Sequence, residues 1–112
     1  MIPESKFVEI AKGLFRKTRQ GKVRWEQYSN GSYIARLPGS AVIVRQYTSA
    51  SSPTYISLDV RGPSGTSVGL WQVFEGEDNW QHAAELHSEI ERGMTGWDKV
   101  LEDIERFIAS DK

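Results

Sequence analysis

The chain has 112 residues, of which 38% are hydrophobic, 11% aromatic and 26% charged, and its formal net charge is −1 at pH 7. This length suits one domain with one core, and the apolar content is too high for a disordered chain. No apolar run approaches the roughly 18 residues that a membrane-spanning helix needs, and a chain without cysteine has no disulfide framework or cysteine-based zinc site.

The first predicted element is a helix over residues 4–20. Its apolar side chains recur at helical spacing and form one stripe: Phe7, Ile10, Ala11 and Leu14. Pro3 suits the start of the helix, where a missing N–H costs nothing, and Gly21 is a suitable stop. Gly13 is an interior glycine that lets another backbone or ring approach closely.

The apolar period then changes to two, which predicts five strands joined by short turns. The strands are 23–28, 33–37, 41–47, 55–61 and 67–74. Asn30-Gly31 and Gly62-Pro63 mark turns, and residues 48–53 are predicted to form a small-residue loop. Because no helix-length segment separates the strands, consecutive strands should pair antiparallel, as a meander.

Two further helices are predicted, over residues 78–92 and 96–109. Their boundary signals are Asp78 with Gln81 and Thr95 with Asp98 as capping boxes, and Gly93 as a stop. The last helix carries an apolar stripe of Trp97, Val100, Leu101, Ile104, Phe107 and Ile108. Packing the helices on the sheet predicts a single two-layer α+β domain over residues 1–112.

The alternation in the fourth strand places Ile56, Leu58 and Val60 inside, and keeping Arg45 out of the core places Val42 and Val44 inside as well. The open face of the sheet is then expected to carry arginines and aromatic rings: Arg24, Arg36, Arg45, Tyr47, Tyr55, Arg61 and Trp71. Such a face can stack bases and pair phosphates. A solvated face whose arginine stems cover tyrosine rings is the favoured alternative.

Charge is unevenly distributed along the chain. Residues 1–61 hold ten Lys/Arg against four Asp/Glu, whereas residues 62–112 hold four against eleven. The basic excess includes five charges within nine residues: Arg16, Lys17, Arg19, Lys22 and Arg24. This run can contact phosphates, but neutralisation of the helix C-terminus and of the acidic C-terminal helices is the favoured interpretation.

One short segment has a recognisable pattern. Thr18-Arg19-Gln20-Gly21-Lys22, followed by Val23-Arg24-Trp25-Glu26, resembles the opening of small bacterial proteins of unknown function, which join a helix to an antiparallel sheet through a Gly-Lys-apolar-x-Trp step. The resemblance covers about the first 28 residues. It implies that Gly21 stops the helix and that Trp25 anchors the first strand, and it implies no activity.

No catalytic or metal-binding constellation is recognisable. Gly21-Lys22 lacks both the upstream glycine and the following Ser or Thr of a phosphate-binding loop. His82 and His87, five residues apart, would lie about 140° apart on a helix and cannot share a metal. His87 lies close to the apolar stripe of its helix, so a hydrogen-bonded histidine at the helix–sheet interface is favoured over a catalytic base. We therefore predict no enzyme activity, no cofactor and no metal.

The sequence predicts a small cytoplasmic interaction or regulatory module that binds protein, either a different partner or a second copy of itself. Four tryptophans support this, because Trp, Tyr and Arg anchor protein interfaces; Trp71 and Trp80 are the least certain to be buried. The segment 1–6 lacks the basic and apolar regions of a signal peptide, and no membrane association is expected. The alternative is nucleic-acid binding by the Arg/Tyr sheet face and the basic run 16–24, although a pI near 6.1 is unlike that of a typical nucleic-acid module.

Overall fold

A computed structural model describes residues 1–110, apart from the side chains of Thr95, Trp97 and Asp98. The elements in chain order are α1 (Glu4–Arg19), β1 (Trp25–Ser29), β2 (Ser32–Leu37), β3 (Ser40–Ser49), β4 (Ser52–Arg61), β5 (Ser67–Phe74), α2 (Trp80–Thr95) and α3 (Trp97–Ala109). The strands form one antiparallel sheet in the order β1-β2-β3-β4-β5. The predicted α+β class and the five-stranded meander are confirmed.

Helix α1 ends in a tight hydrogen-bonded turn. The N–H of Lys22 donates to the carbonyl of Lys17 at 2.9 Å, and that of Gly21 donates to Thr18 at 3.0 Å. This is a Schellman motif, which needs a left-handed residue at Gly21, where φ is 71°. The buried Trp25 then starts β1, and its indole Nε1 donates to Thr18 Oγ1 at 3.0 Å. Helix and sheet are therefore joined at one point by backbone and side chain together.

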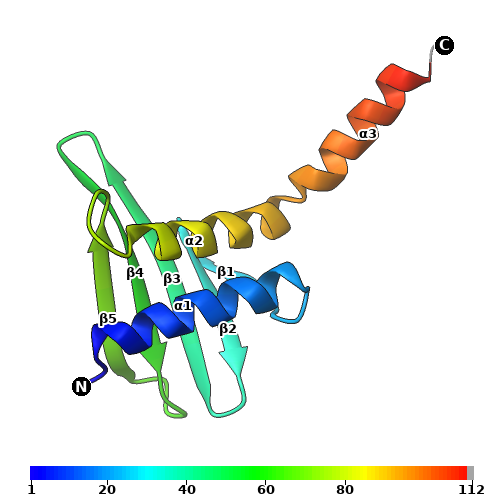
Figure 1. Cartoon of the computed structure of the whole chain (residues 1–112). Helices are drawn as coiled ribbons and strands as arrows, with labels where there is room; N and C mark the ends of the chain where they lie inside the picture. Colours follow the sequence, from blue (N-terminus) through cyan, green and yellow to red (C-terminus); the bar gives the residue numbers. More distant parts are fainter. Residues whose placement is uncertain (111–112) are drawn as a thin grey trace.

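The strand register divides the sheet into two faces. One face packs under α1 and α2 (Figure 1) and carries the apolar residues of the core. Among the strand residues buried there are Trp25, Tyr33, Ala35, Val42, Val44, Ile56, Leu58, Trp71 and Val73. The predicted inward positions of Val42, Val44, Ile56 and Leu58 are confirmed, and Val60 packs on the same face as a partly buried residue. None of the helices within residues 1–110 covers the other face, which we call the open face.

The predicted loop 48–53 is instead the tip of a hairpin. Ser49 pairs with Ser52, so β3 and β4 continue almost to the turn. The register shifts by one residue between this pair and the pair Tyr47–Tyr55, which makes a β-bulge on β4. Pro53 lies in that bulge, where a strand tolerates a residue that has no N–H to donate.

The predicted boundaries of α2 are wrong at both ends. Asn79 occupies the N-cap with φ of 73° and without a side-chain capping bond, so the box of Asp78 and Gln81 does not form. At the other end α2 continues through Gly93, because an exposed helix interior tolerates glycine at a cost of about 1 kcal/mol. Gly96, with φ of 65°, separates α2 from α3. The predicted cap of Thr95 and Asp98 lies outside the described side chains.

Helix α3 lies outside the two layers. It projects from the end of α2 away from the sheet (Figure 1), and its main contacts are with α2. The longest dimension of the molecule is consequently 60 Å, against 37 and 24 Å for the other two. Of the three described helices, α1 and α2 alone form the helical layer.

Candidate functional site

The open face carries a row of three aromatic rings across β3, β4 and β5. The strand register brings Tyr47, Tyr55 and Phe74 side by side. The rings of Tyr47 and Tyr55 are stacked with centroids 4.5 Å apart, and those of Tyr55 and Phe74 are tilted at 4.9 Å. Two sequence-predicted site residues, Tyr47 and Tyr55, are thus brought together, and Phe74 was missed by the sequence analysis.

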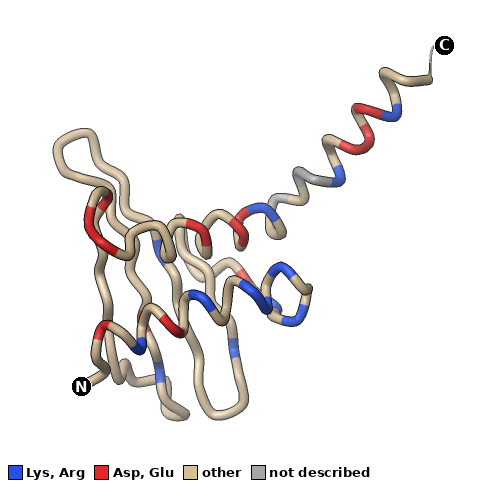
Figure 2. Tube along the Cα trace, in the orientation of Figure 1, with Lys and Arg blue, Asp and Glu red and all other residues tan. Residues whose placement is uncertain are grey.

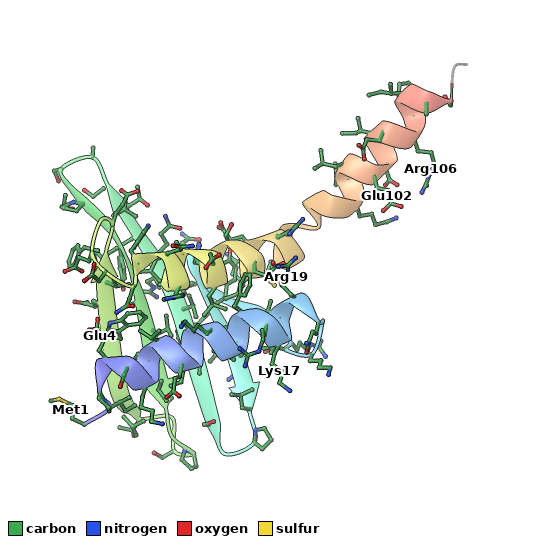
Figure 3. All side chains as sticks on the ribbon, viewed as in Figure 1. Met1, Glu4, Lys17, Arg19, Glu102 and Arg106 are labelled. Carbon is green, nitrogen blue, oxygen red and sulfur yellow. The ribbon has the colours of Figure 1, made fainter. Side chains whose placement is uncertain are left out.

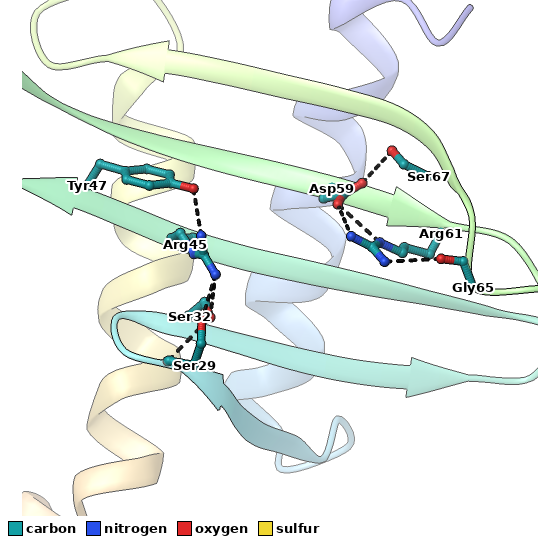
Figure 4. A network of polar contacts seen from close by, with 8 residues as sticks. All are labelled: Ser29, Ser32, Arg45, Tyr47, Asp59, Arg61, Gly65 and Ser67. Atoms are coloured by element: carbon teal, nitrogen blue, oxygen red, sulfur yellow. Dashed lines mark hydrogen bonds and ion pairs between the residues drawn. The ribbon is translucent and has the colours of Figure 1, made fainter.

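Arg45 lies next to this row and is held by hydroxyl groups (Figure 4). Its Nη1 donates to Tyr47 Oη at 2.8 Å, and its Nη2 donates to Ser29 Oγ at 2.6 Å and to Ser32 Oγ at 3.4 Å. The guanidinium also lies over the Tyr47 ring, 5.3 Å from its centroid. Among the described residues, Arg45 thus contacts neutral groups, and its positive charge has no carboxylate within ion-pair distance.

The other two arginines of the open face are paired with carboxylates. Arg61 donates from Nε and Nη2 to Asp59 Oδ2 at 3.1 and 3.0 Å, and from Nη1 to the Gly65 carbonyl at 3.1 Å (Figure 4). Arg36 Nε lies 3.5 Å from Glu26 Oε1. These pairs favour a solvated, internally neutralised surface at Arg36 and Arg61.

A shallow hollow of about 200 Å³ lies between these groups. It is lined by Tyr28, Ile43, Arg45, Tyr47, Ser57, Asp59, Arg61 and Leu70. Ile34 and Ile43 are buried on this face although no helix covers them. Neighbouring side chains therefore cover part of the open face.

The predicted place of Trp71 on the open face is wrong. Trp71 is 7% exposed and packs in the core under α1. Its Nε1 donates to Glu4 Oε2 at 3.1 Å, and its ring stacks on Phe7 with centroids 6.0 Å apart. The sequence did not reveal this, because Val68 and Leu70 made the opposite face of β5 equally apolar. Trp80 is partly buried against the same core.

The basic run lies at the other side of the molecule. Arg16, Lys17 and Arg19 occupy the last turns of α1 and Lys22 follows in the loop, so the basic positions gather at the end of the helical layer (Figure 2). Arg19 points to α2, where its Nε lies 3.8 Å from Glu89 Oε1, whereas Lys17 lies on the side of α1 away from α2 (Figure 3). Arg24 is exposed just before β1. The structure does not join the basic run and the open face into one surface.

His87 lies between α2 and the sheet, 4% exposed. Its ring centroid is 5.8 Å from that of Tyr33, and its Nδ1 is 3.7 Å from Glu91 Oε1. Burial lowers the pKa of His87, and the Glu91 carboxylate and the Gly31 carbonyl only partly offset this effect. Tyr33 Oη donates to Glu91 Oε2 at 3.3 Å, and burial first, then Glu91, raises the pKa of Tyr33. The predicted position of His87 at the helix–sheet interface is confirmed.

The surface that sequence reasoning misjudged is on α3. Its apolar stripe was predicted, but as part of the core, whereas the described members are about half-exposed or more. The α3 stripe consists of Val100 at 53% exposure, Leu101 at 50%, Ile104 at 49%, Phe107 at 74% and Ile108 at 71%. Trp97 belongs to the predicted stripe, but its side chain lies outside the described residues. Together the five side chains present roughly 500 Å² of apolar surface, near the largest patch of a typical monomer.

The polar face of α3 is held by its own ion pairs. Lys99 Nζ lies 3.9 Å from Asp103 Oδ1, and Arg106 lies 3.4 Å from Glu102 and 3.7 Å from Asp103 (Figure 3). Such i, i+3 and i, i+4 pairs support the helix weakly and occupy its cations. What remains for recognition on α3 is the apolar stripe.

No protein-family model, curated protein or solved structure matches this chain. The resemblance of the first 28 residues to small bacterial proteins therefore stays a prediction. Among residues 1–110, no helix is both long and apolar enough to span a bilayer. Within the same described part of the chain, no three His, Asp or Glu side chains gather as a metal-binding group.

Proposed function

We propose that the protein is a small, non-catalytic, cytoplasmic interaction module that binds protein through the α3 stripe. The observation that carries this proposal is the exposure, between 49% and 74%, of five large apolar residues on one face of a projecting helix. Large exposed apolar patches on small domains are typical of interaction surfaces.

The energetics of α3 support the same conclusion. The helix has 13 residues, and isolated helices of that length are marginal in water, so a helix in a protein depends on packing its apolar face. Covering roughly 500 Å² of apolar surface contributes about 12 kcal/mol before ordering costs are subtracted. A partner that covers the α3 stripe therefore stabilises both the complex and the helix itself.

A protein partner is favoured over a membrane surface. Helices that lie on anionic membranes carry lysine and arginine on the polar face. The described charges of α3 are two cations, Lys99 and Arg106, against the acids Glu102, Asp103 and Glu105, and both cations are engaged in ion pairs. Such a polar face gives no attraction to anionic lipid.

The test compares wild type with Phe107→Ser and with the matched control Lys99→Ser, which places the same side chain on the polar face of the same helix. Each purified chain is examined by size-exclusion chromatography with light scattering and then used to retain proteins from a host lysate. We expect wild type and Lys99→Ser to associate with protein, itself or another, and Phe107→Ser to lose that association.

Two results would overturn the proposal. One is association that Phe107→Ser leaves unchanged, which would place the binding surface elsewhere. The other is absence of protein association combined with co-sedimentation on vesicles of phosphatidylserine and phosphatidylcholine that Phe107→Ser abolishes, which would make α3 a membrane-surface helix.

A second candidate function is nucleic-acid binding by the open face. It is favoured by the partly exposed row of Tyr47, Tyr55 and Phe74 next to Arg45, because aromatic rings stack bases and a guanidinium without a carboxylate partner attracts phosphate. It is opposed by the pairing of Arg36 with Glu26 and of Arg61 with Asp59.

Fluorescence anisotropy of labelled single- and double-stranded DNA and RNA, at low and near-physiological salt, tests this second candidate. If nucleic acid binds the open face beside Arg45, its affinity should fall as the salt concentration rises. Arg45→Ala should reduce that affinity more than Arg36→Ala, because Arg36 is already paired with a carboxylate. No binding at low salt, or equal loss in both variants, would exclude the arrangement.

A further inference from the structure

An apolar groove runs beside α1, on the side away from α2. Its volume is about 360 Å³. It is lined by Ile10, Gly13, Leu14, Arg16, Lys17, Leu37, Ser40, Val42 and Val60, and we call it the α1 groove. The lower ends of β2, β3 and β4 extend past α1 on this side without a helix over them (Figure 1). The helical layer therefore has a vacant position next to α1.

Two features of the α1 groove suit a helix as its occupant. Gly13 opens toward space, since the nearest atom to a Cβ built there is Arg16 Nη2 at 4.0 Å, so a second backbone can approach α1 closely. The exposed Arg16 and Lys17 contribute positive charge to the lining. A helix with an apolar face bordered by acids would complement both the apolar lining of the groove and the positive charges of Arg16 and Lys17.

Helix α3 has that character. At about 100° per residue, all the described side chains of the α3 stripe lie within about 60° of Ile104. Asp103 and Glu105 lie at about 100° on either side, so each border of the stripe carries a carboxylate. Asp103 also pairs with Lys99 and Arg106 on the polar face. Pairing two α3 helices along their stripes would bring acids against acids, whereas the α1 groove presents bases to them.

We propose that α3 of one copy docks in the α1 groove of a second copy, and that the exchange is reciprocal. This inference rests on the proposed function and names the partner as another copy of this chain. The groove of the same chain is out of reach, because it lies across α1 from α2 and only Gly96 links α2 to α3. Neighbouring helix axes are about 8–10 Å apart, and one residue spans about 3.8 Å.

The buried area favours reciprocal exchange over a single contact. One docked helix removes roughly 1,000 Å² from water when the stripe and the groove are counted together, which is the lower limit for a specific interface. Two such contacts bury about 2,000 Å², within the range of stable dimers, and close the assembly with two-fold symmetry. The dimer also brings the acidic α3 to the basic run, which the single chain keeps apart.

The experiment uses the full chain and measures dimerisation by sedimentation velocity over a concentration series. We expect wild type and the control Lys99→Ser to dimerise, and Phe107→Ser to raise the dimer Kd at least about 30-fold, as loss of an interface hot spot does. Gly13→Leu fills the groove and improves the helix propensity of α1, so it should also abolish the dimer while circular dichroism shows a folded chain.

Mixing the two defective chains distinguishes the proposed geometry. Phe107→Ser keeps an intact groove and Gly13→Leu keeps an intact α3, so the mixture is expected to form a heterodimer with one docked helix. If Gly13→Leu proves poorly folded, charge reversal replaces it: Lys17→Glu should weaken the dimer roughly threefold or more, and Glu105→Lys in the same chain should restore it.

The outcomes separate this inference from the proposed function. Docking of α3 in the α1 groove is overturned by a folded Gly13→Leu chain that dimerises like wild type, or by a wild-type chain that stays monomeric at about 100 µM. Either result leaves the proposed α3-dependent binding of another protein standing. That concentration lies well above the micromolar Kd of a weak specific dimer. A Phe107→Ser chain that dimerises like wild type overturns the inference and counts against the α3 stripe as the binding surface.

Discussion

Substituting Gly69 by alanine should destabilise the domain, although alanine normally stabilises a strand. Gly69 lies in β5 on the helix-covered face, in register with Val60. A Cβ at this position would lie 2.6 Å from Ile2 Cδ1 and 3.1 Å from Phe7 Cζ. Both distances are below van der Waals contact, so the added methyl group must displace its neighbours.

The magnitude follows from which neighbour can move. Ile2 is only partly buried, so its side chain can turn away, but Phe7 is buried and stacked on Trp71 with centroids 6.0 Å apart. Overpacking of a core costs about 1–3 kcal/mol, whereas replacing a strand glycine by alanine returns about 0.5–1 kcal/mol. We expect a net loss of about 1–2 kcal/mol, or a fall in Tm of roughly 4–10 °C.

Thermal and urea denaturation followed by circular dichroism measure this effect. The matched control is Gly93→Ala in α2, where the added Cβ meets open space and should stabilise by about 1 kcal/mol. The double variant Ile2→Ala/Gly69→Ala removes the closest clash and should be more stable than the sum of the single changes predicts. A Gly69→Ala chain at least as stable as wild type would refute this account of the packing.

Three further predictions concern the histidine, the buried tryptophan and the last helix. Folding lowers the pKa of His87 from its ordinary value of 6.5, so the unfolded chain binds more protons than the folded chain. The contribution of neutral His87 to stability should therefore be complete above about pH 6.5 and fall as the pH drops below it. In urea titrations His87→Gln should remove this decline between pH 7 and 5, and an unchanged decline would contradict the prediction. Trp71→Phe should cost about 1–2 kcal/mol in thermal melts, because it removes the bond to Glu4 and part of the stack on Phe7; a wild-type Tm would show that these contacts contribute nothing. A chain ending at residue 95 should unfold cooperatively with a Tm independent of concentration, whereas the full chain's Tm should rise with concentration; loss of cooperative folding on truncation would show that α3 belongs to the core.

Local patterns along the chain predicted most of the fold. Alternation in β4 identified Ile56 and Leu58 as inward, because one face of a half-buried strand must be apolar. In β3, keeping Arg45 out of the core placed Val42 and Val44 inside. The absence of helix-length segments between strands implied an antiparallel meander. Gly21 was recognised as the end of α1, because a left-handed terminal residue is a local requirement.

The candidate sites depended on partners that local patterns do not specify. Arg36, Arg45 and Arg61 look alike in the sequence, yet in the structure two are paired with carboxylates and Arg45 is held by hydroxyls. Glu26 meets Arg36 across two strands, which requires the register. Asp59 and Arg61 stand two residues apart on the same face of β4, so strand alternation alone could have paired them. The sheet-face prediction therefore identified the surface but not which of its charges is uncompensated.

Trp71 and α3 show most clearly what only the tertiary structure decided. In β5 both faces are apolar, so alternation could not choose a side, and the packing of α1 over Phe7 placed Trp71 in the core. The α3 stripe was visible in the sequence because helical spacing alone reveals which face a helix must bury. The surface that buries it is a non-local property, since the single linking residue Gly96 directs α3 away from its own sheet and leaves that face exposed.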